Sequence, residues 1–225
     1  MKVLVIPDVH LKPWMFDQAE ELLNKYNLDT VVFIGDLVDD WNQGCNIQLY
    51  KDTINRAMQF KKDYPNSKFC YGNHEVGYML GGICAGNSEV YHNEILEMLN
   101  KYERLVEPQL AFKIDNVVFS HGGIALSKFG DYSIENIENV KIKNAYDDDD
   151  SPLWARPNPW VKYDKKYTQV AGHSPMEHIT KIDNVWFVDS FGFDPNGMQY
   201  GDQTYLSIDT ITLETHMYKD GERIA

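Results

Sequence analysis

Short apolar segments, each ending in a polar or glycine-containing turn, recur along the chain. Their length and their β-branched and aromatic residues predict strands over residues 2–7, 30–35, 67–71, 116–120, 168–171 and 185–189. Between the early segments, apolar residues at helical spacing predict helices over residues 14–26, 48–63 and 88–102. A strand pattern that alternates with a helix pattern is typical of an α/β fold.

The second half of the chain lacks long helical patterns between its strands. Residues 113–117 and 181–185 each place an Asp-Asn pair between apolar residues, which predicts two tight β-hairpins. Residues 204–218 have the pattern of two more strands. Late strands without helices predict a second, antiparallel part of the structure. We therefore expect an α/β fold in which a two-sheet β-sandwich is flanked by helices, formed by residues 1–225 as a single domain.

The size and hydropathy of the chain fit this expectation. It has 225 residues, of which 43% are hydrophobic, enough for one large core. Its longest apolar runs, such as residues 31–34, are strand-sized and far shorter than the ~20 residues of a membrane helix. Residues 1–8 lack the long apolar stretch and the cleavage site of a signal peptide. We expect no membrane segment and a cytoplasmic location.

The cysteines and the charge exclude several classes of protein. Cys45, Cys70 and Cys84 are odd in number and lack C-x-x-C spacing, which argues against a disulfide framework and a zinc–thiolate site. The formal net charge is -13. This charge disfavours general nucleic-acid binding, because phosphate backbones need clustered Lys and Arg.

Five polar segments follow predicted strands and carry side chains that can bind metal ions. They are Asp8-Val9-His10, Gly35-Asp36-Leu37-Val38-Asp39, Gly72-Asn73-His74-Glu75, Ser120-His121-Gly122-Gly123 and Gly172-His173-Ser174-Pro175. Residues two apart share a face of a strand, so Asp8 and His10 would reach one ion together if the extended geometry continues that far. Mixed imidazole and oxygen ligands favour Mn, Fe or Zn over Ca or Mg.

In this order the segments resemble the D-x-H, G-D-x-x-D, G-N-H-E, H-G-G and G-H motifs of the calcineurin-like metallophosphoesterase superfamily. The resemblance implies a four-layer αββα fold and a centre of two divalent transition-metal ions, with Mn preferred to Fe, Zn or Ni. The metal ligands that it implies are Asp8, His10 and Asp36 for one ion, and Asp36 as a bridge with Asn73, His121 and His173 for the other.

The resemblance also implies how a phosphate ester is hydrolysed. Two ions ~3.5–4 Å apart can hold a phosphoryl group and lower the pKa of a bridging water towards ~7, which supplies a metal-bridged hydroxide as the nucleophile. His74 is the expected general acid for the leaving oxygen, because it follows the metal ligand Asn73 and so lies beside the metals. Asn73 is also expected to contact the substrate phosphate. Asp39 is expected to orient His74, since a carboxylate bonded to one ring nitrogen favours the protonated ring.

Two features resemble the phosphoprotein phosphatase branch and its bacterial and phage relatives, which include symmetrical dinucleoside tetraphosphatases. Pro175 stands two positions after His173, where many phosphodiesterase branches have the second histidine of a G-H-x-H motif. Residues 151–157 resemble the L-W-x-R stretch of bacterial members, whose arginine contacts substrate phosphate. Arg156 is therefore the expected phosphate clamp, because a forked guanidinium matches two phosphate oxygens.

Two segments depart from that branch or have no assigned role. The branch usually continues G-D-x-x-D with Arg-Gly, but Asp40-Trp41 stand there, so a second phosphate-binding arginine is missing. Asp40 would repel a phosphomonoester dianion, and Trp41 could stack on a base or another ring. The loop from Val76 to Asn87 is rich in glycine and apolar residues, and either walls the substrate site or packs in the core. We favour the wall.

The sequence predicts a metal-dependent hydrolase of phosphate esters. The first hypothesis is a phosphomonoesterase or phosphoanhydrase of the serine/threonine-phosphatase type, acting on a phosphoprotein, a nucleotide or a small phosphorylated metabolite. The second is a phosphodiesterase acting on nucleotides or nucleic-acid ends, which Asp40 and Trp41 favour and Pro175 disfavours. The third is a non-catalytic scaffold with the same fold. The sequence does not predict the oligomeric state.

Overall fold

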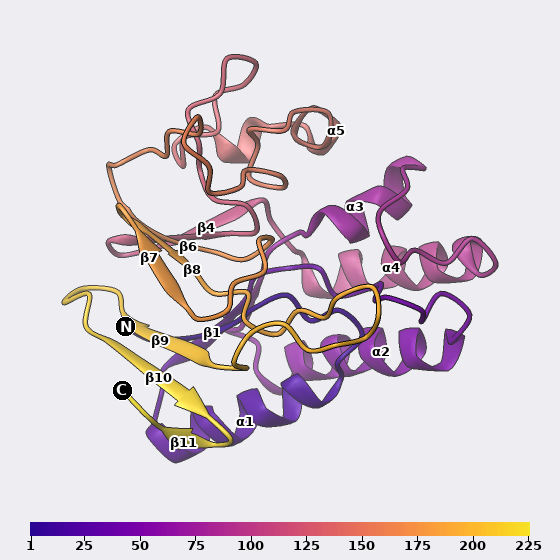
Figure 1. Ribbon diagram of the computed structural model, residues 1–225, viewed down its shortest axis with the longest axis horizontal. Coiled ribbons are helices and arrows are strands. Elements are labelled where there is room, and N and C mark those ends of the chain that lie inside the picture. Colours follow the sequence, from indigo (N-terminus) through magenta and orange to yellow (C-terminus); the bar gives the residue numbers. More distant parts are fainter.

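The computed structural model describes residues 1–225, which form two β-sheets with helices outside them (Figure 1). The elements, in chain order, are β1 (Lys2–Ile6), α1 (Trp14–Tyr26), β2 (Thr30–Phe33), α2 (Ile47–Asp63), β3 (Lys68–Phe69), α3 (Asn73–Leu80), α4 (His92–Val106), β4 (Ala111–Ile114), β5 (Val117–Ser120), the 3-10 helix η1 (Ile137–Asn139), α5 (Ile142–Tyr146), β6 (Thr168–Ala171), β7 (Thr180–Ile182), β8 (Val185–Phe187), β9 (Tyr205–Asp209), β10 (Thr215–Lys219) and β11 (Glu222–Arg223). The first sheet has the order β11-β10-β9-β1-β2-β3, and the second has the order β4-β5-β6-β8-β7.

Strand β1 shows how the sequence divides the interior into separate cores. Val3 and Val5 belong to the apolar cluster between the two sheets, whereas Leu4 and Ile6 belong to the cluster under the helices. All of them are fully buried. Alternate residues of a strand point to opposite faces, so a strand covered on both sides is apolar throughout. Burial of each such side chain contributes about 1.5–3 kcal/mol.

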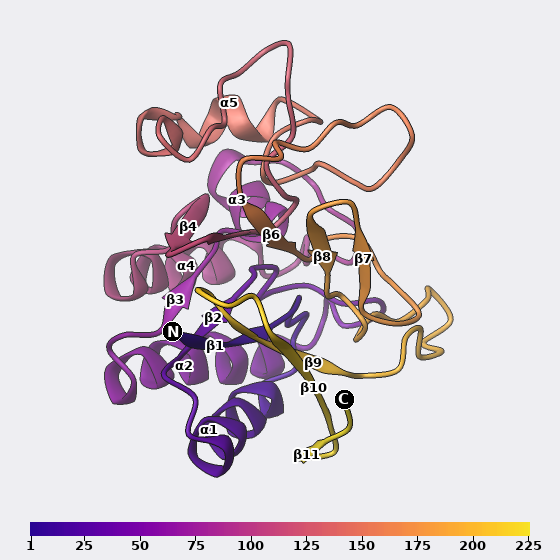
Figure 2. The same cartoon turned by 90° about the vertical axis from the view of Figure 1, so that its left-hand side faces the viewer.

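Helices and loops form the outer layers. Helices α1, α2 and α4 cover the outer face of the first sheet (Figure 2). The outer face of the second sheet is covered by α5, η1 and the long connection in which they lie, seen at the top of Figure 1. The expected two-sheet α/β sandwich is confirmed. None of the helices combines the length and apolar composition needed to cross a lipid bilayer.

The second half of the chain differs from the expectation of an antiparallel part. Strands β5, β6 and β8 run parallel, and only the edge strands β4 and β7 pair antiparallel with their neighbours. The connection from β5 to β6 crosses the sheet mainly as irregular chain, so no long helical pattern reveals the parallel crossover. The two hairpins are confirmed, with left-handed backbone at Asp115 (φ 49°) and Asp183 (φ 53°). Strands β9 and β10 return to the first sheet.

The segment from Val76 to Asn87 is not a single loop. Its first part belongs to helix α3, in which Val76 and Tyr78 are buried against the core. Ala85, further along the segment, lines the pocket described below. The segment therefore packs in the core with its first part and lines the pocket with a later part, which are the two alternatives that the sequence left open. The helical part was missed because Gly77 interrupts a short and weakly amphipathic pattern.

Candidate active site

The predicted site residues follow parallel strands of both sheets. Strands β1, β2 and β3 are parallel in the first sheet, and β5, β6 and β8 are parallel in the second. The residues that follow them include Asp8, Asp36, Asn73, His121, His173 and Asp189. Ligands of α/β sheets bind beyond the carboxyl ends of parallel strands, because loops from neighbouring strands converge there. Motifs that are far apart in the sequence meet at this edge of the sandwich.

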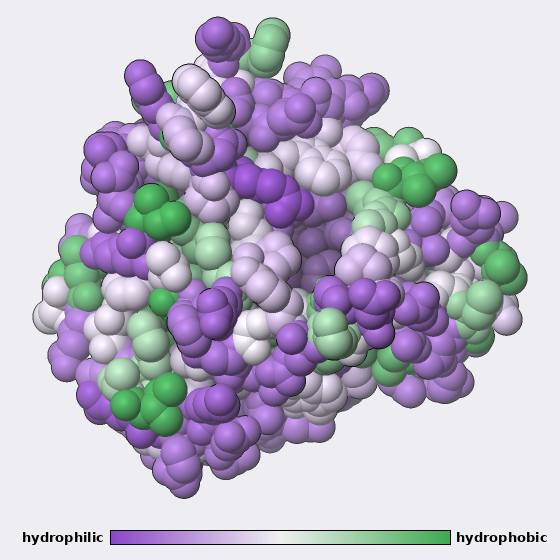
Figure 3. Space-filling view, in the orientation of Figure 1, coloured by the Kyte–Doolittle hydropathy of each residue, from purple (hydrophilic) through white to green (hydrophobic).

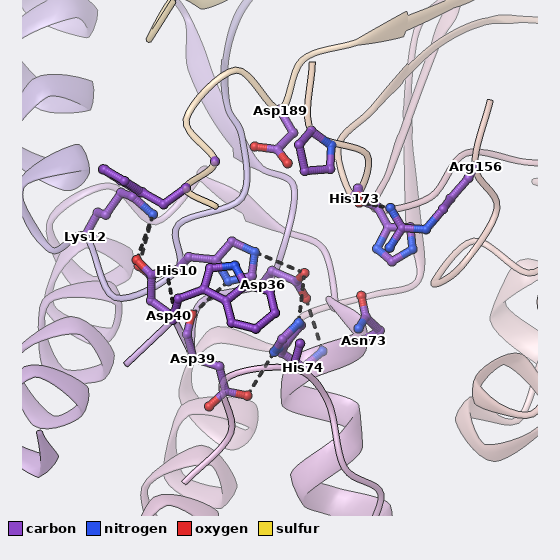
Figure 4. A pocket seen from close by; sticks show the side chains of 15 residues that line it. His10, Lys12, Asp36, Asp39, Asp40, Asn73, His74, Arg156, His173 and Asp189 are labelled. Carbon is purple, nitrogen blue, oxygen red and sulfur yellow. Dashed lines mark hydrogen bonds and ion pairs between the residues drawn. The ribbon is translucent and has the colours of Figure 1, made fainter. Parts of the chain in front are cut away.

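A hydrophilic hollow opens above this edge (Figure 3). The predicted site residues that line it are His10, Asp36, Asp39, Asn73, His74, Arg156 and His173. Asp8 and His121 do not line it and are buried, with 1% and 0% of their surface exposed. Figure 4 shows the side chains of His10, Asp36 and His74 close together, with Asn73 and His173 beside them. The structure therefore brings the motif residues into one pocket and its buried floor.

His121 has three potential ligand atoms around one ring nitrogen. Its Nε2 lies 2.9 Å from Asn73 Oδ1, 3.2 Å from Asp36 Oδ2 and 3.0 Å from His173 Nδ1. The other ring nitrogen, Nδ1, lies 3.1 Å from the carbonyl oxygen of Ile34. A carbonyl oxygen only accepts hydrogen bonds, so Nδ1 carries the proton and Nε2 keeps the lone pair in the neutral ring. His121 is thereby oriented as metal-binding histidines are.

His10 has the same arrangement on the other side of Asp36. Its Nδ1 lies 2.9 Å from the backbone oxygen of Asp39, so its Nε2 is the lone-pair nitrogen of the neutral ring. That Nε2 lies 3.6 Å from Asp36 Oδ2. Asp36 is thus shared by two groups of potential ligands, one with His10 and His74 and one with His121 and His173.

These contacts fit a site for cations. Lone pairs of Asn73, Asp36 and His173 converge on the lone pair of His121 Nε2, and they repel one another unless positive charge lies among them. His173 Nε2 is buried without a hydrogen-bond partner, which is unusual for a polar atom in a protein interior. The imidazole, carboxylate and amide donors suit a first-row transition metal. The position of Asp36 between two groups suits a pair of ions.

The electrostatics of the site also favour positive charge. Burial lowers the pKa of His121, but the carboxylates of Asp36 and Asp8 outweigh burial and raise it to about 9. Burial raises the pKa of Asp36, yet the rings of His121 and His74 hold it well below its ordinary value. The site therefore attracts positive charge, as protons or as metal ions.

Asp8 and His10 do not share a strand face, contrary to the expectation. Strand β1 ends at Ile6, and His10 has a left-handed backbone (φ 41°). The Asp8 carboxylate accepts a hydrogen bond from the backbone N–H of His173, 2.9 Å from Oδ2. Asp8 lies outside both groups of potential ligands around Asp36. Its ligand role stays a prediction.

His74 and Asp39 form the pair that the sequence predicts. His74 Nδ1 lies 2.9 Å from Asp39 Oδ2, and His74 Nε2 lies 3.9 Å from Asp36 Oδ2 (Figure 4). Burial lowers the pKa of His74, but the charges of Asp36 and Asp39 outweigh burial and raise it to about 9. The ring is therefore held by one nitrogen and presents the other to the pocket, in a state that can donate a proton.

Arg156 lies at the pocket wall, as expected. Its Nη1 donates to the backbone oxygen of His173 at 2.7 Å, and its side chain is solvent-exposed. Figure 4 shows the guanidinium beside the His173 ring. The other guanidinium donors are free to contact a ligand in the pocket. The structure thus places Arg156 where a phosphate clamp would lie, and the clamping role stays a prediction.

Lys12 is a pocket residue that the sequence did not reveal. It is 5% exposed, and its Nζ lies 3.1 Å from the backbone oxygen of His10 and 3.4 Å from Asp40 Oδ2. A buried cation therefore balances the charge of Asp40, which the sequence alone presents as purely repulsive. Asp189 also lines the pocket, and burial raises its pKa to about 6. The one sequence signal for Lys12 is a lysine next to apolar residues just after the D-x-H motif.

The backbone around the site is held in an unusual conformation. A non-glycine residue with positive φ costs of order 1–3 kcal/mol and persists only where its surroundings enforce it. Gly35 (φ 109°) is needed because a Cβ there would lie 2.6 Å from the backbone nitrogen of Gly72. The predicted site residues with positive φ are His10 (41°), Asp36 (45°), Asp39 (66°) and His173 (62°). Four of the predicted site residues are thus held by their surroundings in a backbone conformation that L-residues rarely adopt.

The carboxylate and imidazole groups gathered beyond the parallel strands of this two-sheet α/β sandwich suit a metal-binding site. The sequence model of the calcineurin-like phosphoesterases matches residues 1–210. The chain therefore belongs to the calcineurin-like phosphoesterase family and is a metal-dependent phosphoesterase. Members of this family use two divalent metal ions, in agreement with the two groups that share Asp36. A search among curated proteins finds no match for the sequence.

Two solved structures show the same fold at low sequence identity. A cold-active protein tyrosine phosphatase is 19% identical with a TM-score of 0.58, and the match covers 99% of this chain and 78% of that chain. A metallophosphoesterase from Sphaerobacter thermophilus is 12% identical with a TM-score of 0.50, and the match covers 100% of this chain and 89% of that chain. These similarities concern the fold alone.

Proposed function

We propose that this phosphoesterase is a phosphomonoesterase or phosphoanhydrase of the phosphoprotein phosphatase branch, with Mn preferred to Fe, Zn or Ni. Two divalent ions in the site would polarise the phosphoryl group and acidify a water as the nucleophile. The proposed metal ligands are Asp8, His10, Asp36, Asn73, His121 and His173. The substrate would be a phosphoprotein, a nucleotide or a small phosphorylated metabolite.

The observation that carries this proposal is the contact between His74 and Asp39. The 2.9 Å contact from Nδ1 to Oδ2 leaves His74 Nε2 facing the pocket, beside Asp36. In the proposed reaction, His74 gives its Nε2 proton to the leaving oxygen of the ester. Asp39 holds the ring in position and stabilises the imidazolium before the transfer.

Two cations support a monoester or anhydride over a diester. Arg156 and Lys12 both line the pocket, and Lys12 offsets the carboxylate of Asp40. A phosphomonoester carries about two negative charges near neutral pH, since its second pKa is about 6, so it gains more from these cations than a diester with one charge. Pro175 also lines the pocket, in place of the second histidine expected in many diesterases.

A phosphodiesterase is the second candidate, and one observation favours it. Trp41 lines the pocket and is 39% exposed, so its indole is accessible to a planar group. A diester of a nucleotide carries an aromatic base that could stack there. This observation does not require the second ester bond, because a nucleotide monoester would use the same ring.

The organisation and location of the protein complete the proposal. We propose that residues 1–225 act as one domain, since the core between the sheets contains side chains from both sheets. We also propose a cytoplasmic location. Cys45, Cys70 and Cys84 are free thiols in the structure, in keeping with a reducing compartment.

The test compares p-nitrophenyl phosphate with bis(p-nitrophenyl) phosphate on metal-depleted protein supplied with Mn, Fe, Zn or Ni. We expect metal-dependent hydrolysis with a higher kcat/KM for the monoester. Arg156→Ala should raise KM for the monoester about tenfold, a change worth about 1.4 kcal/mol, whereas Arg104→Ala, on the exposed side of α4, should not. A higher kcat/KM for the diester would replace the monoesterase by the diesterase, and inactivity with both esters would refute both candidates.

A further inference from the structure

Two buried tyrosines contact the carboxylate that holds His74. The hydroxyls of Tyr50, in α2, and Tyr78, in α3, each donate to Asp39 Oδ1 at 2.8 Å. The other carboxylate oxygen, Oδ2, faces His74 Nδ1 at 2.9 Å. Tyr50 and Asp39 are both 0% exposed, and Tyr78 is 3% exposed. The two oxygens of Asp39 are thus divided between the tyrosines on one side and the histidine on the other.

The direction of these hydrogen bonds follows from the available protons. The hydroxyl oxygen of Tyr78 accepts the backbone N–H of Ser88 at 2.8 Å, so its own proton is directed to Asp39. A hydroxyl has one proton, and the hydroxyl of Tyr50 donates its proton to Asp39 Oδ1. With two O–H donors directed at it, Oδ1 serves as the acceptor of both hydrogen bonds. The lone pairs that remain for His74 are those of Oδ2.

The tyrosines also fix the carboxylate in space. Tyr50 and Tyr78 come from different helices, and Ser88 ties Tyr78 to the segment after α3. Asp39 itself has a left-handed backbone (φ 66°), so its side chain leaves the chain in a direction that only its surroundings stabilise. Rotation of the carboxylate would break two hydrogen bonds in a buried region, which is unfavourable because it leaves polar groups there unpaired.

We propose that Tyr50 and Tyr78 are positioning residues of the phosphoesterase, which hold Asp39 so that His74 delivers its proton to the leaving oxygen. This inference rests on the proposed role of His74 as the general acid. Both hydroxyls bind Oδ1, so they leave Oδ2 aimed at the ring of His74. In their absence the ring loses its fixed partner, and proton delivery becomes less efficient while the phosphate and metal positions are unaffected.

A purely structural role of the tyrosines makes a different prediction. If the hydroxyls only stabilise the fold, their removal lowers the amount of folded enzyme and reduces activity equally for every leaving group. If they position the general acid, the loss depends on how much the leaving oxygen needs a proton. A basic leaving group such as phenol needs the proton, whereas p-nitrophenol leaves readily without it.

The experiment measures kcat/KM of Tyr50→Phe, Tyr78→Phe and the double variant with a series of aryl phosphates from p-nitrophenyl to phenyl. Tyr102→Phe is the matched control, because Tyr102 is a buried tyrosine of the same core that makes no contact with Asp39. We expect the double variant to lose at least about tenfold more activity with phenyl phosphate than with p-nitrophenyl phosphate, within the range of general-acid catalysis. His74→Asn should show the same dependence on the leaving group, and Tyr102→Phe should not.

A second readout does not depend on activity. In proton NMR of the folded protein, the Nδ1–H signal of His74, assigned by its loss in His74→Asn, should shift in Tyr50→Phe and Tyr78→Phe and stay in place in Tyr102→Phe. Each single variant keeps one tyrosine hydroxyl that donates to Asp39, so both measurements can be made on the single variants if the double variant does not fold. Equal losses across the series, or an unmoved Nδ1–H signal, would overturn the positioning role. Wild-type protein without metal-dependent hydrolysis of any ester would instead refute the proposed function itself.

Discussion

His121 Nε2 lies 3.0 Å from His173 Nδ1 in a part of the interior where neither ring is more than 5% exposed. In the neutral ring, His121 Nε2 keeps a lone pair because Nδ1, on the opposite side, faces the carbonyl of Ile34. Asp36 and Asn73 add their oxygens to the same point. Such a concentration of lone pairs is stable with cations between them, so the site and the stability of the fold are linked.

Removal of the metal should therefore lower the melting temperature. A ligand present at 100 times its Kd stabilises the folded state by about 2.7 kcal/mol, which is about 5–10 °C for a chain of this size. We expect a decrease of this order when a chelator is added, and recovery with excess Mn. The measurement is differential scanning calorimetry with and without the chelator. An unchanged melting temperature would mean that these side chains do not bind a metal ion tightly enough to stabilise the fold.

Asp39→Asn should reduce turnover without loss of metal. The amide offers His74 an N–H donor or a weaker acceptor in place of the carboxylate, so the ring loses both its orientation and the charge that favours its protonated form. We expect kcat to fall by about 10²-fold or more, as for other general acids, while metal content stays that of the wild type. Steady-state kinetics and elemental analysis on the same sample check this. A variant that loses its metal would point to a structural role of Asp39 at the backbone contact with His10.

Lys12→Met should reduce monoester hydrolysis more than diester hydrolysis. The substitution keeps the length of the side chain but leaves the carboxylate of Asp40 unbalanced in the pocket. A dianionic substrate is repelled more than a monoanionic one, so we expect the ratio of the two kcat/KM values to fall about tenfold, which corresponds to about 1.4 kcal/mol.

The double variant Lys12→Met/Asp40→Asn is the control for this prediction. It removes both charges, so the ratio should return towards that of the wild type. If the double variant keeps the low ratio, Lys12 acts through a contact other than the one with Asp40, such as the backbone oxygen of His10.

Glu75→Gln should destabilise the fold. The buried carboxylate of Glu75 accepts the backbone N–H groups of Gly72 and Leu37, and thereby joins the start of α3 to the Asp36 segment. Glutamine keeps one acceptor oxygen and turns a donor towards the other N–H group, so we expect a loss of about 1–3 kcal/mol. Urea unfolding measures it, with the exposed Glu97→Gln as the control. Equal unfolding free energies of the two variants would contradict this role of Glu75.

Periodicity alone predicted the regular elements well. Helix α1 begins and ends as expected, because its buried residues recur at helical spacing and Asn27 adopts the left-handed conformation that ends a helix. Strand β6 has the predicted bounds, whereas the other five predicted strands are real but shorter than expected, and β3 contains only two residues. Apolar residues beyond the strand ends are buried in turns of the site, so hydrophobicity overestimates the length of the strands.

The residues of the candidate site were likewise predicted only in part. Motif residues meet as expected because each follows a strand whose parallel pairing decides where its loop lies. The extended geometry considered for Asp8 and His10 is absent, because the chain leaves the extended conformation before His10. Tyr50, Tyr78 and Lys12 could not be assigned from the sequence, since their roles depend on helices that pack against Asp39 and on a turn that brings Lys12 to Asp40.

The most direct test of the account is a crystal structure of the protein soaked in Mn, with data collected at the Mn absorption edge. The account predicts two anomalous peaks, one on each side of the Asp36 carboxylate, with His10 near one and His121 and His173 near the other. Asp36→Ala should remove at least one peak. A single peak away from Asp36, or no peak at a Mn concentration that supports hydrolysis, would contradict the proposed two-metal centre.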